Sequence, residues 1–323
     1  MKVGVYFDLR NPPQWKQDWS RLYGFTLEMC QEAEHQGLDS IWVTEHHLFE
    51  DGYLTQPLTF LAAVAARTKR VRLGTAIMLA PLRPAAQIAE EATVVDILSS
   101  GRLDLGLGAG YRIPEFQLYG ADIEQRYKLL DSRIAELRQI WREGKVTPPP
   151  VQSRPPLWLG YQGPKGAKRA GNMGEALLTA EGAMWEHYRA GLIEGGHDPA
   201  IGRMAGGING WVTDNPDADW PMVAKHVSAQ MDSYRKHMME GTGQPAPRPY
   251  DPEKARSRKL GEAGPIGALL YATPEKAAKQ IRNYVGDAPV EEVFFWGSIA
   301  GMPEDMIARN IQTLAKRVKP LLA

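Results

Sequence analysis

The stretch Ser40-Ile41-Trp42-Val43-Thr44-Glu45-His46-His47-Leu48-Phe49 leads from an apolar strand pattern directly into three titratable side chains. Parallel α/β barrels place their chemistry in this way, at the carboxyl ends of strands. Because neighbouring residues of a strand point to opposite faces, His46 and His47 are predicted to diverge. If Ile41 and Val43 face the surrounding helices, His46 enters the barrel mouth. We therefore expect His46 to be the reactive histidine.

Segments typical of strands and of helices alternate along the 323 residues. Strict alternation predicts a parallel sheet, and eight units predict a closed (β/α)8 barrel, the α/β TIM-barrel class, as one domain over residues 1–323. The eight predicted strands span Lys2–Phe7, Ser40–Val43, Val71–Thr75, Leu103–Gly108, Leu157–Gly160, Ala176–Thr179, Ala205–Val212 and Glu292–Trp296.

A segment rich in proline and glycine, residues 241–267, precedes the last strand–helix unit. Loops of this length inside a compact domain are typically binding loops, lids or disordered segments. We interpret it as a long mobile insertion that closes over cofactor or substrate. The alternative is a solvated insertion without such a role.

The composition excludes several classes of protein. There are 38 basic and 38 acidic side chains, so the sequence indicates neither a nucleic-acid partner nor a membrane surface. One cysteine, Cys30, excludes an internal disulfide and favours a reducing compartment. Neither a signal peptide nor an 18-residue apolar run is apparent, and we expect a cytoplasmic protein.

Other motifs for chemistry are absent from the sequence. A metal site at Glu45-His46-His47 is disfavoured, because adjacent strand residues diverge and no further His or Cys follows at ligand spacing. We therefore predict no metal. The sequence also lacks a Gly-x-Ser-x-Gly elbow and a P-loop, so hydrolase and NTPase functions have no support.

Glycines recur on the predicted inward face of the strands, at Gly4, Gly74, Gly106 and Gly108. Barrels usually fill their interior with branched side chains. Glycine at these positions would leave space for a large planar ligand deep in the mouth. The alternative is that the glycines form tight bends or bulges at the barrel corners.

Three loops at the predicted mouth suit a cofactor. After the fourth strand, Gly108-Ala109-Gly110 would bring backbone close to a ring system, with Tyr111 and Arg112 contacting cofactor or substrate. The loop Gly160–Lys168 opens a helix whose amides favour a phosphate. The apolar run Thr75–Pro81 suits an aromatic ring face. Solvent-exposed loops and, for Thr75–Pro81, a buried strand extension are the alternatives.

Together these motifs resemble the luciferase-like flavin-dependent monooxygenases and the related F420-dependent oxidoreductases. The resemblance covers almost the whole chain and is densest in Gly37–His47, Val71–Ala76 and Ser100–Tyr111. It implies a (β/α)8 barrel, a homodimer or larger, that takes reduced FMN from a separate flavin reductase. With O2, such an enzyme oxygenates a small organic substrate.

The resemblance also implies roles for individual residues. His46 matches the family's catalytic histidine, which assists proton transfer, and neutral-range titration suits that role. Tyr111 and Arg112 would line the site. A non-prolyl cis peptide is expected at Ala76–Ile77. The cofactor-binding set is then Thr75, Ala76, Ile77, Gly108, Ala109, Gly110, Tyr161, Gln162, Gly163 and Gly166.

The motifs are compatible with two cofactors, FMN and F420. Gln162-Gly163-Pro164 resembles F420-dependent members of the family, whereas Glu45–Phe49 and Asp51-Gly52-Tyr53 resemble FMN monooxygenases. We expect FMN. The alternative is an F420-dependent oxidoreductase that transfers hydride without O2, and the basic residues of the insertion could hold the acidic tail of F420. A non-catalytic flavin-binding protein and an aldolase-type barrel are further alternatives with less support.

Overall fold

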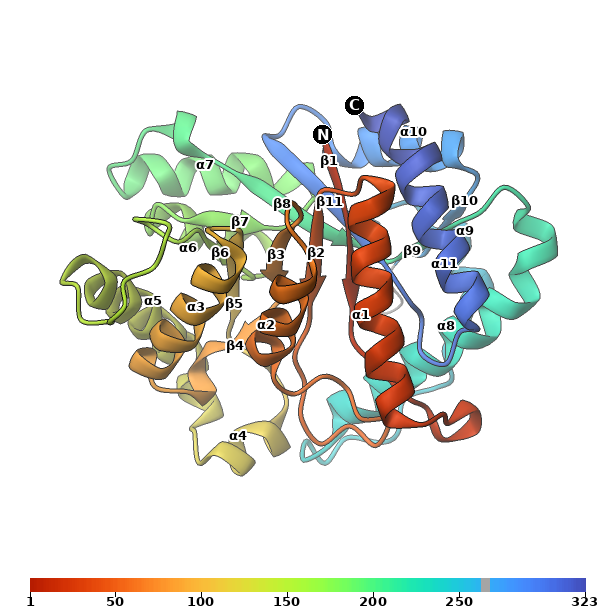
Figure 1. Ribbon diagram of the computed structural model, residues 1–323, viewed down its shortest axis with the longest axis horizontal. Helices are drawn as coiled ribbons and strands as arrows, with labels where there is room; N and C mark the ends of the chain where they lie inside the picture. Colours follow the sequence, from red (N-terminus) through yellow and green to blue (C-terminus); the bar gives the residue numbers. More distant parts are fainter. Residues whose placement is uncertain (263–267) are drawn as a thin grey trace.

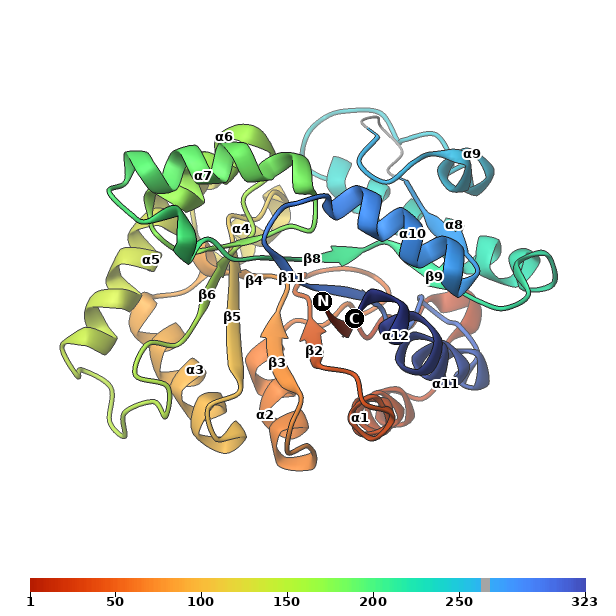
Figure 2. The ribbon, with the colours of Figure 1, turned by 90° about the horizontal axis from the view of Figure 1, so that it is seen from above.

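A closed parallel β-barrel forms the centre of the computed structural model, which describes residues 1–262 and 268–323 (Figures 1 and 2). The strand order is β3-β2-β1-β11-β8-β7-β6-β5-β4, and β3 also pairs with β5, which closes the sheet. β3 and β4 are consecutive at one barrel position, so nine strands occupy eight positions. The predicted (β/α)8 barrel is confirmed. Its strands are β1 (Lys2–Phe7), β2 (Ser40–Val43), β3 (Arg72–Thr75), β4 (Met78–Leu79), β5 (Leu103–Gly108), β6 (Leu157–Leu159), β7 (Ala176–Leu178), β8 (Met204–Ile208) and β11 (Val290–Trp296).

Helices surround the barrel (Figure 2). The first begins after Asp18, whose carboxylate accepts the Arg21 N–H, and ends at Gly37, whose φ of 95° suits glycine. The two termini lie side by side, with the Met1 amino group 3.1 Å from the Leu322 carbonyl oxygen. The helices are α1 (Trp19–Gln36), α2 (Pro57–Arg67), α3 (Ala85–Ser99), α4 (Ile113–Tyr119), α5 (Arg126–Arg142), α6 (Gly163–Asn172), α7 (Trp185–Glu194), α8 (Pro216–Met239), α9 (Pro252–Ser257), α10 (Pro274–Val285), α11 (Glu304–Thr313) and α12 (Lys319–Leu322).

A second small sheet was not predicted. β9 (Gly210–Val212) and β10 (Leu270–Ala272) pair in parallel outside the barrel. The single strand predicted over Ala205–Val212 is therefore divided at Asn209. The Asn209-Gly210 dipeptide is typical of a turn, but the partner of β9 lies about sixty residues further along the chain, so no local pattern predicts the pairing.

The described part of the insertion packs on the body of the protein. It contains α9, and the N–H of the buried Tyr250 donates to Asp232 Oδ1 on α8 at 2.6 Å. The Leu269 N–H, just after the insertion, donates to the Ala255 carbonyl at 3.1 Å. Residues 263–267 of the predicted lid lie outside the described residues, and closure of the segment stays a prediction.

The lower barrel interior is filled by aromatic side chains. The Trp42 ring stacks on Phe294, with 4.7 Å between centroids, and meets Trp158 edge-on at 6.2 Å. A Cβ on Gly74 would lie 2.2 Å from the Trp42 ring, and one on Gly4 would lie 2.0 Å from Ser40 Oγ. The space beside Gly4 and Gly74 is thus occupied by neighbouring side chains. The expectation of a planar ligand at this depth is wrong.

Trp42→Ala is predicted to lower the free energy of unfolding by about 3–5 kcal/mol, because truncation of a buried aromatic side chain leaves a cavity. Ile193→Ala on the exposed face of α7 is the matched control, with an expected change within about 0.5 kcal/mol. Urea denaturation followed by circular dichroism measures both. A loss below about 1 kcal/mol for Trp42→Ala would contradict the packing role.

Candidate active site

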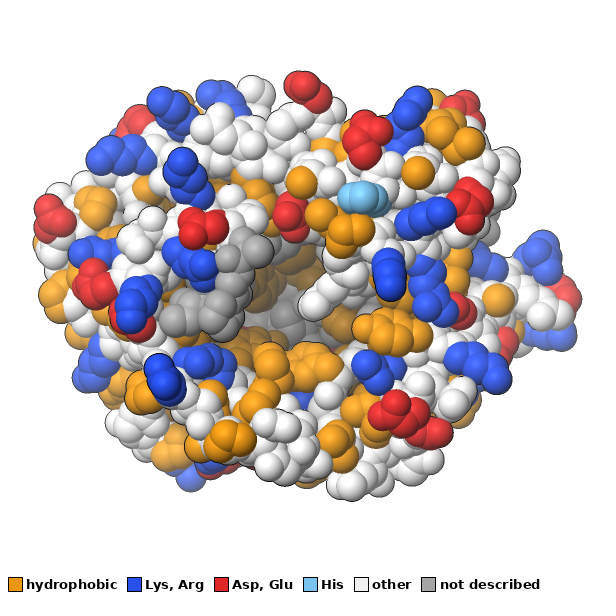
Figure 3. Space-filling view, turned by 180° about the vertical axis from the view of Figure 1, so that it is seen from behind, with side chains coloured by type: hydrophobic (Ala, Val, Ile, Leu, Met, Phe, Trp, Pro, Cys, Tyr) orange, Lys and Arg blue, Asp and Glu red, His pale blue; other side chains and the backbone are white. Residues whose placement is uncertain are grey.

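A large cavity of about 970 Å³ lies at the carboxyl ends of the barrel strands. Its wall is formed by β1, β11 and α8 and by the segments that follow β2, β3, β5, β6, β7 and β8. The surface seen in Figure 3 is hollowed near its centre, with apolar side chains around the hollow. Nine of the predicted site residues contribute to the cavity wall: His46, Ala76, Ile77, Ala109, Gly110, Tyr111, Tyr161, Gln162 and Gly163.

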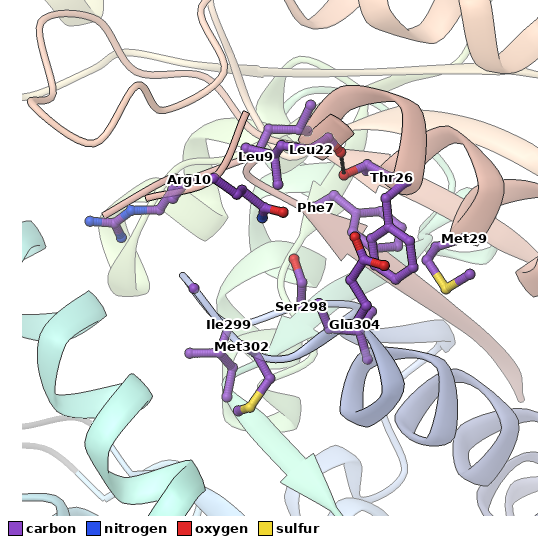
Figure 4. Close-up of a pocket in the computed structure, with 14 residues that line it drawn as sticks. Phe7, Leu9, Arg10, Leu22, Thr26, Met29, Ser298, Ile299, Met302 and Glu304 are labelled. Atoms are coloured by element: carbon purple, nitrogen blue, oxygen red, sulfur yellow. Dashed lines mark hydrogen bonds between the residues drawn. The ribbon is translucent and has the colours of Figure 1, made fainter. Parts of the chain in front are cut away.

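A second cavity, between α1 and the segment before α11, is much smaller (Figure 4). Its volume of about 20 Å³ suits a single water molecule and excludes a ring cofactor. Arg10 contributes to its wall but directs its guanidinium away from the other labelled side chains (Figure 4).

Three of the predicted cofactor residues lie behind the wall of the large cavity and support it. The Thr75 hydroxyl donates to the Gly106 carbonyl at 2.7 Å and accepts the Gly106 N–H at 2.9 Å. A Cβ on Gly166 would lie 2.8 Å from the Cβ of Tyr161, so glycine allows α6 to approach the loop before it. Gly108 likewise leaves room for the side chain of Ile77.

The Ala76–Ile77 peptide bond is cis, as the resemblance implies. The Ile77 side chain lies against two glycines: a Cβ on Gly108 would be 1.9 Å from Ile77 Cδ1, and one on Gly160 would be 2.6 Å from Ile77 Cγ2. No larger residue fits at either position while Ile77 keeps its place. The glycines near the barrel mouth therefore accommodate a side chain of the cavity wall.

His46 lies in the cavity wall with both ring nitrogens engaged. Its Nδ1 is 2.8 Å from Glu115 Oε1, and the Tyr111 hydroxyl is 3.1 Å from its Nε2. The residue is 7% exposed, and its ring packs against the rings of Phe49 and Tyr53, with centroids 4.8 and 4.9 Å away. His46 contributes to the cavity wall and His47 does not, but strand parity does not continue past Val43, where β2 ends, because Glu45 also lines the cavity.

The protonation states of His46 and Glu115 follow from burial and from the donors around them. Burial lowers the pKa of His46, and the neighbouring Glu115 only partly offsets this. Burial alone would raise the pKa of Glu115, but the His46 hydrogen bond, the His47 N–H at 2.9 Å and Arg112 lower it overall. At neutral pH we therefore assign an ionised Glu115 and a neutral His46.

This assignment determines which nitrogen of His46 faces the cavity as an acceptor. An ionised carboxylate only accepts, so Nδ1 carries the proton that is donated to Glu115. Burial raises the pKa of Tyr111, so its hydroxyl stays protonated and donates to the unprotonated Nε2. The result is an unprotonated ring nitrogen and a hydroxyl that donates to it at one point of the cavity wall.

Glu45 and His47 form a separate network. Glu45 Oε1 lies 2.7 Å from His47 Nε2 and 2.7 Å from an Arg83 nitrogen, and Glu45 Oε2 accepts the Leu79 N–H at 2.8 Å. This carboxylate therefore joins the segment after β2 to the segment after β3. Among the described residues, no group of three or more His, Cys, Asp and Glu side chains is arranged to hold a metal ion.

Arg112 does not line the cavity, which corrects its predicted contact with substrate. Its side chain is fully buried, its Nε donates to the His237 carbonyl at 3.0 Å, and it pairs with Glu115 at 3.1 Å and with Glu240. It also donates to the His47 carbonyl. Arg112 thus positions Glu115 and joins the end of α8 to the segment after β2. The sequence could not reveal this, because Glu240 is distant along the chain.

Sequence reasoning missed Glu115, Tyr53 and Tyr234. Glu115 is buried in the first turn of α4, where an acidic residue is usually read as a favourable charge at a helix start. The two tyrosines contribute to the cavity wall, and their hydroxyl oxygens are 2.6 Å apart. Tyr234 comes from α8, so no local pattern could place it here.

The N-terminus of α6 opens on the cavity through Gln162 and Gly163. No side chain caps this helix, so its first turn lacks a side-chain acceptor, and the helix dipole favours an anion here. Lys165 is exposed in the same turn. The geometry suits one phosphate group.

The fold and this site define a barrel oxidoreductase of the luciferase-like class. The family described as luciferase-like monooxygenase matches residues 1–290, and the chain belongs to this family. No helix among residues 1–262 and 268–323 is both long and apolar enough to cross a membrane.

Relatives with different cofactors resemble the chain. It is 28% identical to an F420-dependent glucose-6-phosphate dehydrogenase of Amycolatopsis mediterranei over 305 residues, which cover 84% of this chain and 87% of that one. It is 32% identical over 165 residues, 46% of each chain, to the oxygenase component of a flavin-dependent trigonelline monooxygenase of Acinetobacter baylyi. The monooxygenase RslO1 from Streptomyces bottropensis shares the fold, with a TM-score of 0.82, 21% identity and full coverage of both chains.

Glu115→Leu is predicted to lower the free energy of unfolding by about 3–5 kcal/mol, because the buried Arg112 guanidinium loses one carboxylate partner and two further donors lose their acceptor. Glu124→Leu, at an exposed position shortly after α4, is the control, with an expected change within about 0.5 kcal/mol. Chemical denaturation at neutral pH measures both. Equal losses in the two variants would contradict the role assigned to Glu115.

Proposed function

We propose that this protein is the oxygenase of a two-component system, which receives reduced FMN from a separate flavin reductase and uses O2 to oxygenate a small organic substrate. The observation that carries the proposal is the His46–Tyr111 pair, whose Nε2 and hydroxyl oxygen lie 3.1 Å apart in the wall of a cavity large enough for a ring cofactor and a substrate. A cytoplasmic homodimer or larger assembly belongs to the same proposal.

The residues present fit FMN. Ile77, supported by Gly108 and Gly160, offers an apolar surface for a ring, and Ala76, Ala109 and Gly110 continue this wall. Tyr161, Gln162 and Gly163 lead to the uncapped N-terminus of α6, where the phosphate would be held.

Three of the five basic residues of the insertion are already paired, which counts against their holding the acidic tail of F420. Lys254, Arg256 and Arg258 each pair with a carboxylate of the insertion itself: Asp251 at 3.1 Å, Glu253 at 2.7 Å and Glu262 at 3.3 Å. On α6, Lys168 pairs with Glu194 and Arg169 with Asp131. These cations are therefore already matched by carboxylates, whereas an acidic cofactor tail would need additional positive charge.

F420-dependent hydride transfer is the second candidate. It is supported by the 28% identity to an F420-dependent dehydrogenase over 84% of this chain. It also uses the same histidine, because a neutral Nε2 can accept a proton from an alcohol.

Reduced FMN, when bound, would supply the electrons that activate O2. The chain's own residues would hold and move protons: the Tyr111 oxygen can accept a proton from the cavity while its hydroxyl proton passes to His46 Nε2 through their hydrogen bond. Glu115 stabilises the positive charge that His46 then carries. The rings of Phe49, Tyr53 and Tyr234 around His46 exclude water from this face of the imidazole.

Paired anaerobic titrations test the proposal. Tight binding of reduced FMN, followed by O2 consumption above the free-flavin rate on admission of air, is the expected result. Selective binding of F420, with no binding of reduced FMN, would contradict it. Fluorescence of the two cofactors reports binding directly.

His46→Asn is predicted to lower product formation by about 100-fold or more, because general acid–base catalysis at one side chain typically contributes that factor. Binding of reduced FMN should change little. His187→Gln, exposed on α7, is the control and should retain the original rate. Product formation by His46→Asn at the original rate would refute the assigned role.

Gly108→Val is predicted to weaken FMN binding by about ten-fold or more, because its side chain displaces Ile77 toward the ring site and overpacking typically costs 1–3 kcal/mol. Gly24→Ala on α1, where a Cβ has no neighbour within 4 Å, is the control. Fluorescence titration measures the dissociation constants. Unchanged affinity in Gly108→Val would show that Ile77 does not border the ring.

A further inference from the structure

We propose that the substrate of this cavity is an uncharged, ring-containing molecule that presents a hydrogen-bond acceptor, and that anionic substrates are rejected. The inference deepens the proposed function and rests on it, because the same cavity is shared with the cofactor. It follows from the aromatic side chains, the free hydrogen-bond donors and the charges of the wall.

The part of the wall away from the α6 N-terminus is aromatic. Tyr6 from β1, Tyr53, Tyr234 from α8 and Phe294 from β11 contribute their rings to this part. Tyr6 meets Phe294 edge-on at 5.7 Å, and Tyr53 meets Tyr234 edge-on at 5.8 Å. Such rings bury a flat hydrophobic molecule at little cost in conformational entropy.

The polar groups of this part are hydrogen-bond donors. The Tyr6 hydroxyl donates to Asn209 Oδ1 at 3.1 Å, which leaves the amide NH2 of Asn209, a cavity residue, to donate to a ligand. The hydroxyl oxygens of Tyr53 and Tyr234 are 2.6 Å apart and share one hydrogen bond, so one of their two protons is left over. Burial raises the pKa of both tyrosines, so both hydroxyls stay protonated. A carbonyl or similar neutral acceptor suits these donors.

The charges of the wall oppose an anion. Among the described residues that line the cavity there is no lysine or arginine, whereas two glutamates line it: Glu181, and Glu45, whose carboxylate is buried against Arg83 and His47. The arginines behind the wall are already paired: Arg10 with Asp51 at 2.7 Å, Arg83 with Glu45 at 2.7 Å and Arg112 with Glu115 at 3.1 Å. An anionic group in this part would be buried without a positive partner, which is strongly unfavourable.

The protein is then expected to differ in its substrate from the relative named for glucose 6-phosphate. A sugar phosphate carries a dianion that needs positive charge in the substrate part of the cavity. The α6 N-terminus is the anion site on the wall, and the proposed function assigns it to the cofactor phosphate.

A nearly isosteric pair of probes tests the inference. 2-Naphthamide is neutral and presents a carbonyl, whereas 2-naphthoate is an anion of almost the same shape. We expect 2-naphthamide to bind the purified protein about ten-fold more tightly than 2-naphthoate or better, since an unpaired buried charge typically costs more than one lost hydrogen bond. Ligand-observed NMR titration, with and without saturating FMN, measures both.

Asn209→Ala is expected to weaken 2-naphthamide binding by about five-fold, because the carbonyl of the probe loses a hydrogen-bond donor in the cavity. Asn283→Ala, exposed on α10, is the control. Equal or tighter binding of 2-naphthoate, or no binding of 2-naphthamide by the original protein, would overturn the inference. Binding without FMN is independent of the cofactor titrations, so the two proposals can fail separately.

Discussion

The carboxylate of Glu115 is the group on which the site depends. It accepts hydrogen bonds from His46 Nδ1, from the His47 backbone and from Arg112, and it brings together the segment after β2, the start of α4 and, through Arg112, the end of α8. Such a buried carboxylate stays ionised only because several donors surround it. Its charge in turn keeps the proton of His46 on Nδ1 and leaves Nε2 as an acceptor in the cavity.

The cavity itself depends on close approach of backbone and side chains. Gly108 and Gly160 leave room for Ile77, and Gly166 lets α6 approach Tyr161. These glycines shape the cavity wall because they leave room for neighbouring groups. Gly4 and Gly74, deeper in the barrel, leave room for Ser40 and Trp42, whose side chains fill the interior. Glycine therefore contributes both to the filled lower barrel and to the cavity wall near the mouth. The side chains next to each glycine determine which of the two it supports.

The alternation of apolar strands and amphipathic helices was enough to predict the barrel. Strand parity correctly predicts that His46 lines the cavity and His47 does not, but it wrongly predicts that Glu45 faces the surrounding helices. The cis peptide at Ala76–Ile77 followed from the resemblance. Contacts between distant segments could not be predicted. Its place after the fourth strand predicts Arg112 as a substrate ligand, but Glu240 and His237 lie beside it and bind its guanidinium. Tyr234 comes from a helix more than a hundred residues further along the chain. The pairing of β9 with β10 was missed for the same reason.

Nitrogen NMR of protein labelled at histidine reports the protonation state of His46. At neutral pH we expect a neutral His46 ring, with its proton on Nδ1 and an unprotonated Nε2. A doubly protonated ring, or a neutral ring with the proton on Nε2, would contradict the account, because the cavity would then face a donor where the proposed chemistry needs an acceptor.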